Sequence, residues 1–407
     1  MLNYYTGYKP GDTPGNLPPP YYWWEAGAMF SSLVDYWYYT GDTQFNDITT
    51  QALLHQVGPN NDYMPPNQTK TLGNDDQAFW GMAAMTAAEV NYPNPPQDQP
   101  QWLALAQAVF NTQVPRWDPD TCGGGLRWQI FPFNNGYNYK NTISNGCFFN
   151  LGARLAKFTG NMTYADQAEK AWDWMFAIGL ISPDYHFYDG SDSKINCTDT
   201  NHIQWTYNAG INLYGAASMW NITQSDKWRT RVQGIIDGLG VFFYQDTKIM
   251  FEVACEPNGK CDVDQRSFKA YLSRWIAATT KVAPWTHEVL MPYVQASAKA
   301  AAAQCTGGTD GQQCGMLWYQ GGFDGSLGVG EQMSALEVVQ SLLIDQVGGP
   351  FSSDNGGTSR GDPTAGTGNP EIPKEFSQIT AGDKVGAGFL TTIVLVALLG
   401  GSWWVIS

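Results

Sequence analysis

Basic residues are scarce in this chain. Lys and Arg number 22 against 37 Asp and Glu among 407 residues, which gives a formal net charge of −15. Nucleic acids and anionic membrane surfaces are bound by clustered Lys and Arg. The composition therefore argues against both as direct partners and favours a neutral or cationic one.

The usual signatures of metal and cofactor chemistry are missing as well. No histidine has the H-E-x-x-H or another metal-ligand spacing, and no P-loop or dinucleotide fingerprint occurs. Ser326 misses the G-x-S-x-G pattern by its first position. We therefore expect no metal and no cofactor, and carboxylates remain as the candidate catalysts. The histidines are His55, His186, His202 and His287.

A C-x-x-C pair is also absent, although the chain holds seven cysteines. Two pairs close short loops and a third pair lies in loop-like sequence, which predicts the disulfides of an oxidising compartment. Cys147 lies in an apolar run, where we expect a buried thiol. Four N-glycosylation sequons also indicate the secretory pathway. The predicted disulfides are Cys255–Cys261, Cys305–Cys314 and Cys122–Cys197, and the sequons are at Asn67, Asn161, Asn196 and Asn221.

The two ends of the sequence indicate where the protein is found. Residues 1–6 lack the basic start and apolar core of a secretion leader, so we expect a leader ahead of Met1 in the natural chain. Small residues at 381–382, a brief spacer and the apolar run 389–399 resemble a glycosylphosphatidylinositol (GPI) attachment signal, with Gly382 as the attached residue. A short transmembrane anchor is the alternative. Both place the protein at the cell surface, in the membrane's outer leaflet or the cell wall.

The rest of the chain divides into a folded part and a linker. The Gly-, Ser-, Thr- and Pro-rich segment 347–380 predicts a flexible stalk, so we expect a folded domain over 1–346 and the attachment signal over 381–407. Within the domain, an apolar helix, a small turn and a second helix opened by an aromatic residue recur at about 60 residues. Such a period predicts stacked helical hairpins.

Six hairpins predict an all-α fold, a closed (α/α)6 toroid, which we expect to be a monomer. The first helix of several hairpins is apolar nearly all round, whereas the second carries charges on one side, so the first helices should form the inner ring. Residues 116–141 should form a loop over one mouth of this ring, where function concentrates. The expected inner helices span residues 22–39, 75–90, 144–158, 204–220, 265–281 and 330–344.

The chain is rich in aromatic side chains, with 17 Trp and 21 Tyr, and many of these rings should line a cleft. Two adjacent acids, Asp75 and Asp76, stand at the start of the second inner helix. Glycosidic bond cleavage typically uses two carboxyl groups, so this pair is the candidate catalyst. The structural alternative is a well-capped helix, because Asn74 is a good N-cap and acids stabilise a helix start.

In the toroid, both carboxyl groups would project at one mouth about 5 Å apart, the separation of retaining glycosidases. Asp35 is a third acid, which either orients a sugar hydroxyl or serves as a hydrogen-bonded core acid. Trp24 and Trp205 are candidates for stacking on a sugar. Further substrate-binding candidates have polar or aromatic side chains, for which a place in the core is the alternative. They are Trp80, Trp128, Asn145, Tyr207, Asn208, Arg274 and Trp318.

Six stretches within residues 4–345 carry a family resemblance: 20–27 (PYYWWEAG), 33–42 (LVDYWYYTGD), 74–80 (NDDQAFW), 123–129 (GGGLRWQ), 142–146 (TISNG) and 314–320 (CGMLWYQ). By these stretches the chain resembles glycoside hydrolase family 76, the endo-α-1,6-mannanases. It is most similar to the fungal cell-wall subfamily of "defective for filamentous growth" and "defective cell wall" proteins. The departure is at the N-terminus, where the subfamily's leader and much of its first helix are missing before Leu2.

This resemblance implies an (α/α)6 fold and a retaining mechanism, with Asp75 as nucleophile and Asp76 as acid/base. It also implies α-mannose-containing glycans as substrates, and transfer of GPI-anchored proteins from the membrane to cell-wall glucan. On this basis we expect a transglycosidase. The alternatives are a hydrolytic endo-α-1,6-mannanase and a GPI-anchored carbohydrate-binding wall protein without catalysis.

Overall fold

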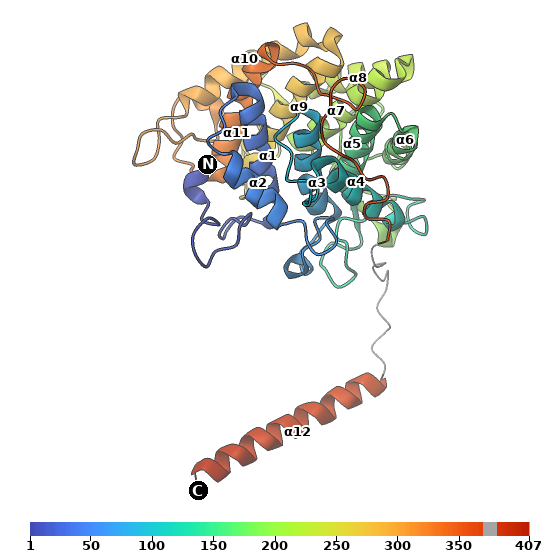
Figure 1. Cartoon of the computed structure of the whole chain (residues 1–407), viewed down its shortest axis with the longest axis vertical. Coiled ribbons are helices and arrows are strands. Elements are labelled where there is room, and N and C mark those ends of the chain that lie inside the picture. Colours follow the sequence, from blue (N-terminus) through green and yellow to red (C-terminus); the bar gives the residue numbers. More distant parts are fainter. Residues whose placement is uncertain (369–380, 407) are drawn as a thin grey trace. The chain divides into compact units, whose positions relative to one another are not determined.

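The computed structural model describes residues 1–368 and 381–406. The chain divides into a large unit, Met1–Pro370, and a small one, Glu371–Ser407. The large unit is built of paired helices, as the hairpin pattern predicts (Figure 1).

Six helices form the inner ring of the large unit. Each contacts the next in the chain's order, and the last contacts the first, so the ring is closed. Their buried residues are spread over most of the helix surface, which explains their nearly uniform apolar sequences. They are α1 (Trp23–Thr40), α3 (Asn74–Glu89), α5 (Thr142–Thr159), α7 (Thr206–Thr223), α9 (Phe268–Val282) and α11 (Val329–Gln340).

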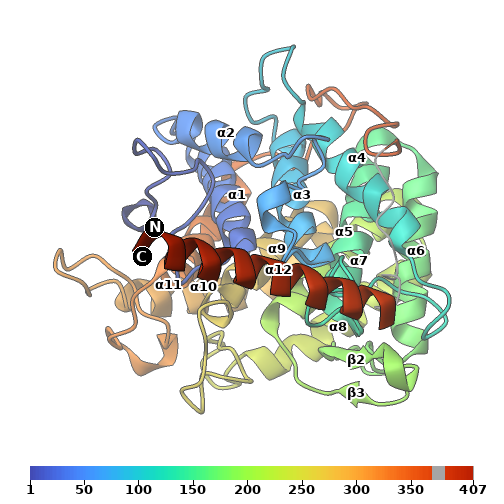
Figure 2. The same ribbon diagram turned by 90° about the horizontal axis from the view of Figure 1, so that it is seen from below.

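Five outer helices cover this ring, and in Figure 2 α2, α4 and α6 lie outside α1, α3 and α5. The α-helical toroid is thus confirmed, with one difference from six equal hairpins. Within the described residues, α11 continues into a 3-10 helix, η9 (Ser341–Gln346), and no outer α-helix follows it in the large unit. The outer helices are α2 (Asn46–His55), α4 (Trp102–Gln113), α6 (Met162–Ala177), α8 (Asp226–Gly238) and α10 (His287–Ala303).

Short turns join the two helices of a hairpin. Gly41 ends α1 and Gly160 ends α5, both with left-handed backbone (φ 69° and 71°), and each donates its N–H to a carbonyl four residues earlier. Ser225 then opens α8 by accepting the Trp228 N–H. The remaining 3-10 helices are η1 (Leu2–Tyr4), η2 (Pro66–Gln68), η3 (Val114–Arg116), η4 (Ser193–Ile195), η5 (Leu239–Phe242), η6 (Gln265–Ser267), η7 (Pro284–Thr286) and η8 (Trp318–Gln320).

The two ends of the toroid differ. The N-terminal ends of the inner helices meet at what we call the mouth end, together with the longest loops. A small antiparallel sheet lies there, in the order β1 (Tyr139–Asn141), β2 (Gly190–Asp192) and β3 (Thr200–Asn201). Tyr139 pairs with Asp192, and Gly190 pairs with Asn201.

The C-terminal halves of the inner helices form what we call the closed end, which is filled by buried ion pairs. Arg154 on α5 pairs with Glu89 on α3 at 2.8 Å. Arg274 on α9 pairs with Asp35 on α1 at 2.7 Å and also with Glu337 on α11. These ion pairs join α3 to α5, and they join α9 to both α1 and α11.

The prediction of a flexible stalk from residue 347 is wrong for residues 347–368. This segment lies against the toroid and belongs to the large unit. The Phe351 N–H donates to the Glu89 carbonyl at 2.7 Å, and the Asp362 N–H donates to Gln107 Oε1 at 2.6 Å. Its composition is low in apolar residues, but its backbone groups find partners on the toroid, which composition alone does not reveal. Residues 369–380 lie outside the described part.

All three predicted disulfides are present, Cys122–Cys197, Cys255–Cys261 and Cys305–Cys314. Cys147 is a buried free thiol, as its apolar surroundings indicate. In the small unit, α12 (Ala381–Ile406) has a stretch, Ala381–Trp403, that is long and apolar enough to cross a membrane. The predicted attachment residue, Gly382, lies in its first turn.

Candidate active site

The first turn of α3 is held by one of its own acids. Gly73 is the N-cap, and its N–H donates to Asp76 Oδ2 at 2.6 Å, so Asp76 closes the helix start. Asn74 is the first helical residue and not the cap that the sequence suggests. Its Nδ2 donates to the Arg127 carbonyl at 2.8 Å, and its own N–H donates to the Trp128 carbonyl at 2.8 Å. Residues 116–141, which we call the mouth loop, are thereby fixed to the helix that carries the acid pair.

A cavity of about 250 Å³ opens in front of this turn. It lies at the N-terminal ends of α1, α3, α5, α7 and α9, whose dipoles favour negative charge there. Four carboxyl groups line it, and none of the described residues lining it is Lys or Arg. The carboxyl groups belong to Asp75, Asp76, Asp189 and Asp264, and the aromatic lining comes from Trp24, Phe79, Trp128, Tyr139, Trp205, Tyr207 and Phe268.

A second cavity of about 340 Å³ adjoins the first. The two share Trp24, Asp76, Trp128 and Asp264, so they are two halves of one cleft. Asp75 lines only the first half. Asp76 therefore stands where the two halves meet, and Asp75 stands to one side.

The electrostatics of the pair separate the two acids. Burial raises the pKa of Asp75 to about 7, partly offset by hydrogen bonds such as the one from the Asp76 N–H. Burial also raises the pKa of Asp76 well above its usual range, and the negative charges of Asp75 and Asp264 raise it further. When Asp75 is ionised, Asp76 therefore tends to keep its proton. Because Oδ2 of Asp76 accepts from Gly73, its other oxygen is the one available to hold that proton.

Two further acids in the cleft are held by aromatic donors. Asp189 accepts from Tyr139 Oη at 2.7 Å and from Trp205 Nε1 at 3.0 Å. Asp264 accepts from Trp24 Nε1 at 3.1 Å. Burial raises the pKa of both carboxyl groups, that of Asp264 to about 7. The sequence interpretation missed these two acids because they lie in loops.

Comparison with known proteins decides what kind of cleft this is. The model of glycosyl hydrolase family 76 matches residues 1–354. The chain belongs to glycosyl hydrolase family 76. It is therefore a glycoside hydrolase, as the resemblance of its motifs implies.

Relatives of this family 76 enzyme are found in fungi. It is 49% identical to the mannan endo-1,6-α-mannosidase DCW1 of Eremothecium gossypii and 48% identical to DCW1 of Saccharomyces cerevisiae, in both cases over 100% of this chain and 90% of the relative. The crystal structure of Dfg5 from Chaetomium thermophilum in complex with glucosamine is 50% identical, with a TM-score of 0.87 over 90% of this chain and 92% of that one.

A more distant structure shares the fold. It is an inactive variant of the α-1,6-mannanase GH76A from Salegentibacter, with two consecutive aspartates changed to asparagine, in complex with α-1,6-mannotriose. It is 17% identical, with a TM-score of 0.64 over 80% of this chain and 89% of that one. At this identity the likeness supports the toroid alone.

Two of the predicted substrate-binding residues line the cleft of this family 76 enzyme. Trp128 is 36% exposed and lines both halves of the cleft. Tyr207 lines the first half and stacks on Phe268 with ring centroids 3.9 Å apart. The stacking candidates Trp24 and Trp205 line the first half as well.

Two predicted tryptophans belong to the core instead. Trp80 is fully buried and stacks on Trp23 on one side and on Tyr63 on the other. Trp318 is 1% exposed, and the ammonium group of Lys269 lies 3.9 Å from its ring centroid. Neither ring lines the described cleft, so the prediction of stacking on a sugar is corrected for both.

Three of the four polar candidates make structural contacts. Asn145 is fully buried and exchanges hydrogen bonds with the backbone of Leu126, which fixes the mouth loop to α5. Asn208 is fully buried in α7, where its amide group has no hydrogen-bond partner among the described residues, so its role in substrate binding stays a prediction. Asp35 and Arg274 pair at the closed end, so the core alternative for Asp35 holds.

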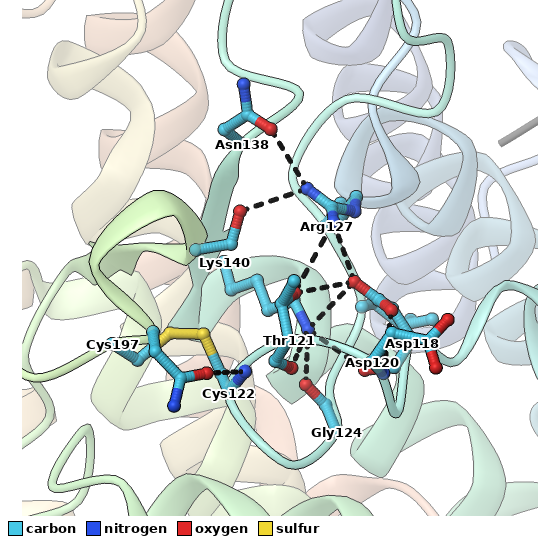
Figure 3. Close-up of polar contacts among 12 residues, drawn as sticks. Asp118, Asp120, Thr121, Cys122, Gly124, Arg127, Asn138, Lys140 and Cys197 are labelled. Carbon is cyan, nitrogen blue, oxygen red and sulfur yellow. Dashed lines mark hydrogen bonds and ion pairs between the residues drawn. A yellow bond between two sulfur atoms is a disulfide. The ribbon is translucent and has the colours of Figure 1, made fainter. Parts of the chain in front are cut away.

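Hydrogen bonds, an ion pair and a disulfide stabilise the mouth loop, which carries Trp128. Figure 3 shows Lys140 donating to the carbonyls of Thr121 at 2.7 Å and Gly124 at 2.6 Å, while Arg127 pairs with Asp118 at 2.8 Å. The Cys122–Cys197 disulfide ties the same loop to the segment before β3 (Figure 3). These contacts hold Trp128 in place.

The four sequons are all in the large unit. Asn67 is in η2 at the mouth end, and Asn161 caps α6 by accepting the Thr163 N–H. Asn196 accepts the Cys122 N–H at 2.6 Å, and Asn221 donates to the Val282 carbonyl at 2.8 Å. Their glycosylation stays a prediction.

Proposed function

We propose that this protein is a retaining α-mannan-acting transglycosidase of the fungal cell surface, with Asp75 as nucleophile and Asp76 as acid/base. The observation that carries this proposal is the position of the two acids in the cleft. Asp76 stands between the two halves and Asp75 lines only the first. A proton donor between subsites and a nucleophile in the donor subsite are what glycosyl transfer requires.

The chemistry then follows in two displacements. In the first, an ionised Asp75 oxygen bonds to the anomeric carbon while the glycosidic oxygen leaves with the proton of Asp76. In the second, the Asp76 carboxylate removes a proton from an incoming hydroxyl, whose oxygen bonds to the anomeric carbon and releases Asp75. Water gives hydrolysis and a sugar hydroxyl gives transfer.

A mannose-containing donor agrees with the relatives, which are named mannan endo-1,6-α-mannosidases. Rings such as Trp24 and Trp128 provide apolar faces for sugars. Asp189 and Asp264 add negative charge that a neutral mannan does not need. A protonated amino sugar complements these acids, and the Chaetomium Dfg5 structure contains glucosamine. We therefore propose the core glycan of GPI anchors, in which an amino sugar lies beside mannose, as the donor.

Transfer is favoured over hydrolysis by the second half of the cleft. Besides the shared residues it is lined by Tyr22, Gln68 and Asn135, among others, which suits a second glycan as acceptor. Cell-wall glucan would be this acceptor, and GPI-anchored proteins would be the group transferred. We further propose that α12 is part of a GPI-attachment signal and that Gly382 is the attached residue, which places the enzyme at the outer face of the membrane.

Product analysis tests substrate and reaction together. The protein is incubated with α-1,6-mannotetraose, with and without a β-glucan oligosaccharide, and the products are examined by mass spectrometry. We expect mannose-to-glucan linkages when the acceptor is present, and none with Asp75→Asn or Asp76→Asn. Asp166→Asn, on the exposed face of α6, is the matched control that should act as wild type. New reducing ends without any transfer product would show that the protein is a hydrolase. No product at all would refute the proposal.

A further inference from the structure

The two members of the acid pair differ in the hydrogen-bond donors that surround them. Asp75 Oδ1 accepts the Asp76 N–H at 3.1 Å, and Asp75 also faces the start of α5, which packs against α3. Asp76 accepts the Gly73 N–H through Oδ2. Among the described residues no ion pair reaches either carboxyl group, so neutral donors are what distinguishes the two.

Two side chains at the start of α5 lie against Asp75. Asn141 lines the same cavity as Asp75, and Ser144 is fully buried with no other hydrogen-bond partner for its hydroxyl among the described residues. Hydrogen bonding by both side chains lowers the pKa of Asp75 and partly offsets the effect of its burial. Cys147, one turn further along α5, faces the same way, since the charges of Asp75 and Asp76 raise the pKa of its thiol.

The Asn141 side chain has two functions. Its Oδ1 caps α5 by accepting the Ser144 N–H at 3.2 Å, which leaves the amide nitrogen for Asp75. The backbone of Asn141 is held as well, because its carbonyl accepts from Asn145 Nδ2 at 2.9 Å and the residue pairs with Gly190 in the sheet. These contacts fix the donors before a substrate arrives.

The other titratable groups that face Asp75 do not supply a positive charge. Arg116, on η3, donates to Asn74 and Gln77 instead, and Lys70 lines only the second half of the cleft. The groups that face Asp75 are acids, phenols and a thiol, each of which is neutral or negative. They are Asp76 on α3, Tyr139 on β1, Cys147 on α5, Tyr207 on α7, and Asp189 and Asp264 in loops.

We propose that Asn141 and Ser144 are positioning residues that hold Asp75 ionised and in place to attack, so that the adjacent Asp76 keeps the proton that it donates. This inference rests on the proposed function. Two adjacent and chemically identical carboxyl groups thereby take different roles. The charge of Asp75 raises the pKa of Asp76, which keeps that acid protonated until the leaving oxygen takes its proton.

Ser144→Ala removes one of the donors. Because the reaction needs an ionised Asp75, the acidic limb of the kcat/KM profile for α-1,6-mannotetraose should move to higher pH by about 1. Below this limb kcat/KM should fall about tenfold. Ser218→Ala is the matched control, since Ser218 is also fully buried with an unpartnered hydroxyl but lies in the C-terminal half of α7. It should follow the wild-type profile.

A purely structural role for Ser144 predicts a different result. The Ser144→Ala profile would then keep its acidic limb, or kcat/KM would fall by the same factor at every pH, and either outcome would overturn the inference. Asn141→Asp gives a second test, because Asp caps a helix as well as Asn does but replaces the donor with a carboxyl group. Its acidic limb should move in the same direction, and an unmoved limb would contradict the role of Asn141.

Infrared spectroscopy measures the ionisation of Asp75 without catalysis. The carboxyl band that Asp75→Asn removes belongs to Asp75, and the change of this band with pH gives its pKa. We expect a higher pKa when Ser144 is Ala than in the wild type. Equal values would overturn the inference and leave the proposed function standing. If the wild type does not cleave the mannan oligosaccharide, the proposed function fails, and the infrared titration still decides whether Ser144 holds Asp75 ionised.

Discussion

Both ends of the toroid bury acids on the same inner helices, but the acids at the two ends have different partners. At the closed end, Asp35 and Glu337 share Arg274. At the mouth end, Asp75 and Asp76 have no ion pair among the described residues, although Lys70 lines the second half of the cleft. Burial raises the pKa of Asp35 to about 7, as it does that of Asp75, so a raised pKa alone does not distinguish the two ends. The comparison teaches that the partner of a buried acid, and not its burial, distinguishes the ion-paired acids of the closed end from the acid pair that we propose as catalytic.

The largest expected effect is at the mouth. Asp75→Asn removes the nucleophile and should lower turnover of α-1,6-mannotetraose by about 10⁴-fold or more. Thermal unfolding should change little, because Asp75 has no ion pair among the described residues. A loss of turnover matched by an equal loss of folded protein would mean that this end is structural too.

Arg274→Met at the closed end should show the reverse pattern. It leaves Asp35 and Glu337 buried without their shared cation, so the free energy of unfolding in urea should fall by about 3–5 kcal/mol. Lys227→Met, which breaks an exposed pair with Glu169, is the control and should cost about 0–1 kcal/mol. The comparison fails if the folded Arg274→Met protein is as stable as the control.

Stability should also depend on pH through an acid at the mouth end. The pKa of Asp264 is raised to about 7 in the folded protein, so its ionised form is disfavoured there. The protonated carboxyl is accommodated at low pH, and stability should be lost as the pH rises through 7. Asp264→Asn should therefore raise the free energy of unfolding at pH 8 by about 1–3 kcal/mol and leave it unchanged near pH 4. Urea titrations at both pH values measure this, and equal effects at the two would show that the acid does not titrate near 7.

The smallest effect separates the two members of the acid pair. Asp76 accepts the Gly73 N–H, so Asp76→Ala should cost about 1 kcal/mol of stability in addition to activity. Asp75→Ala should cost activity without that loss of the cap. Urea unfolding of the two variants side by side makes the comparison, and identical curves would rule out the dual role of Asp76.

The sequence predicts the local features of this molecule well. The inner helices and the disulfides follow from apolar patterns and short cysteine spacings, both of which are local. Among the site residues, a place in the first turn of a helix is not enough. Asp75, Asp76 and Tyr207 stand in a first turn and line the cleft, whereas Asn208, beside Tyr207 in the same turn, is fully buried.

What the sequence does not reveal depends on chain paths between helices. Asp189 lies 16 residues before Trp205, and only the folded loop brings the two side chains together. Residues 347–368 have the composition of a linker. They are nevertheless held by hydrogen bonds of their backbone to α3, α4 and α5, and composition does not reveal such bonds. Asp264 precedes α9 by a few residues, and a search for acids just ahead of each inner helix would have found it.

The most direct test of the assignment is to locate the covalent intermediate. A fluorinated mannosyl donor, which forms the glycosyl-enzyme quickly and releases it slowly, is incubated with the protein, and the digested peptides are analysed by mass spectrometry. The account predicts a mannosyl ester on Asp75. An ester on Asp76, Asp189 or Asp264, or no covalent adduct while the donor is consumed, would contradict it.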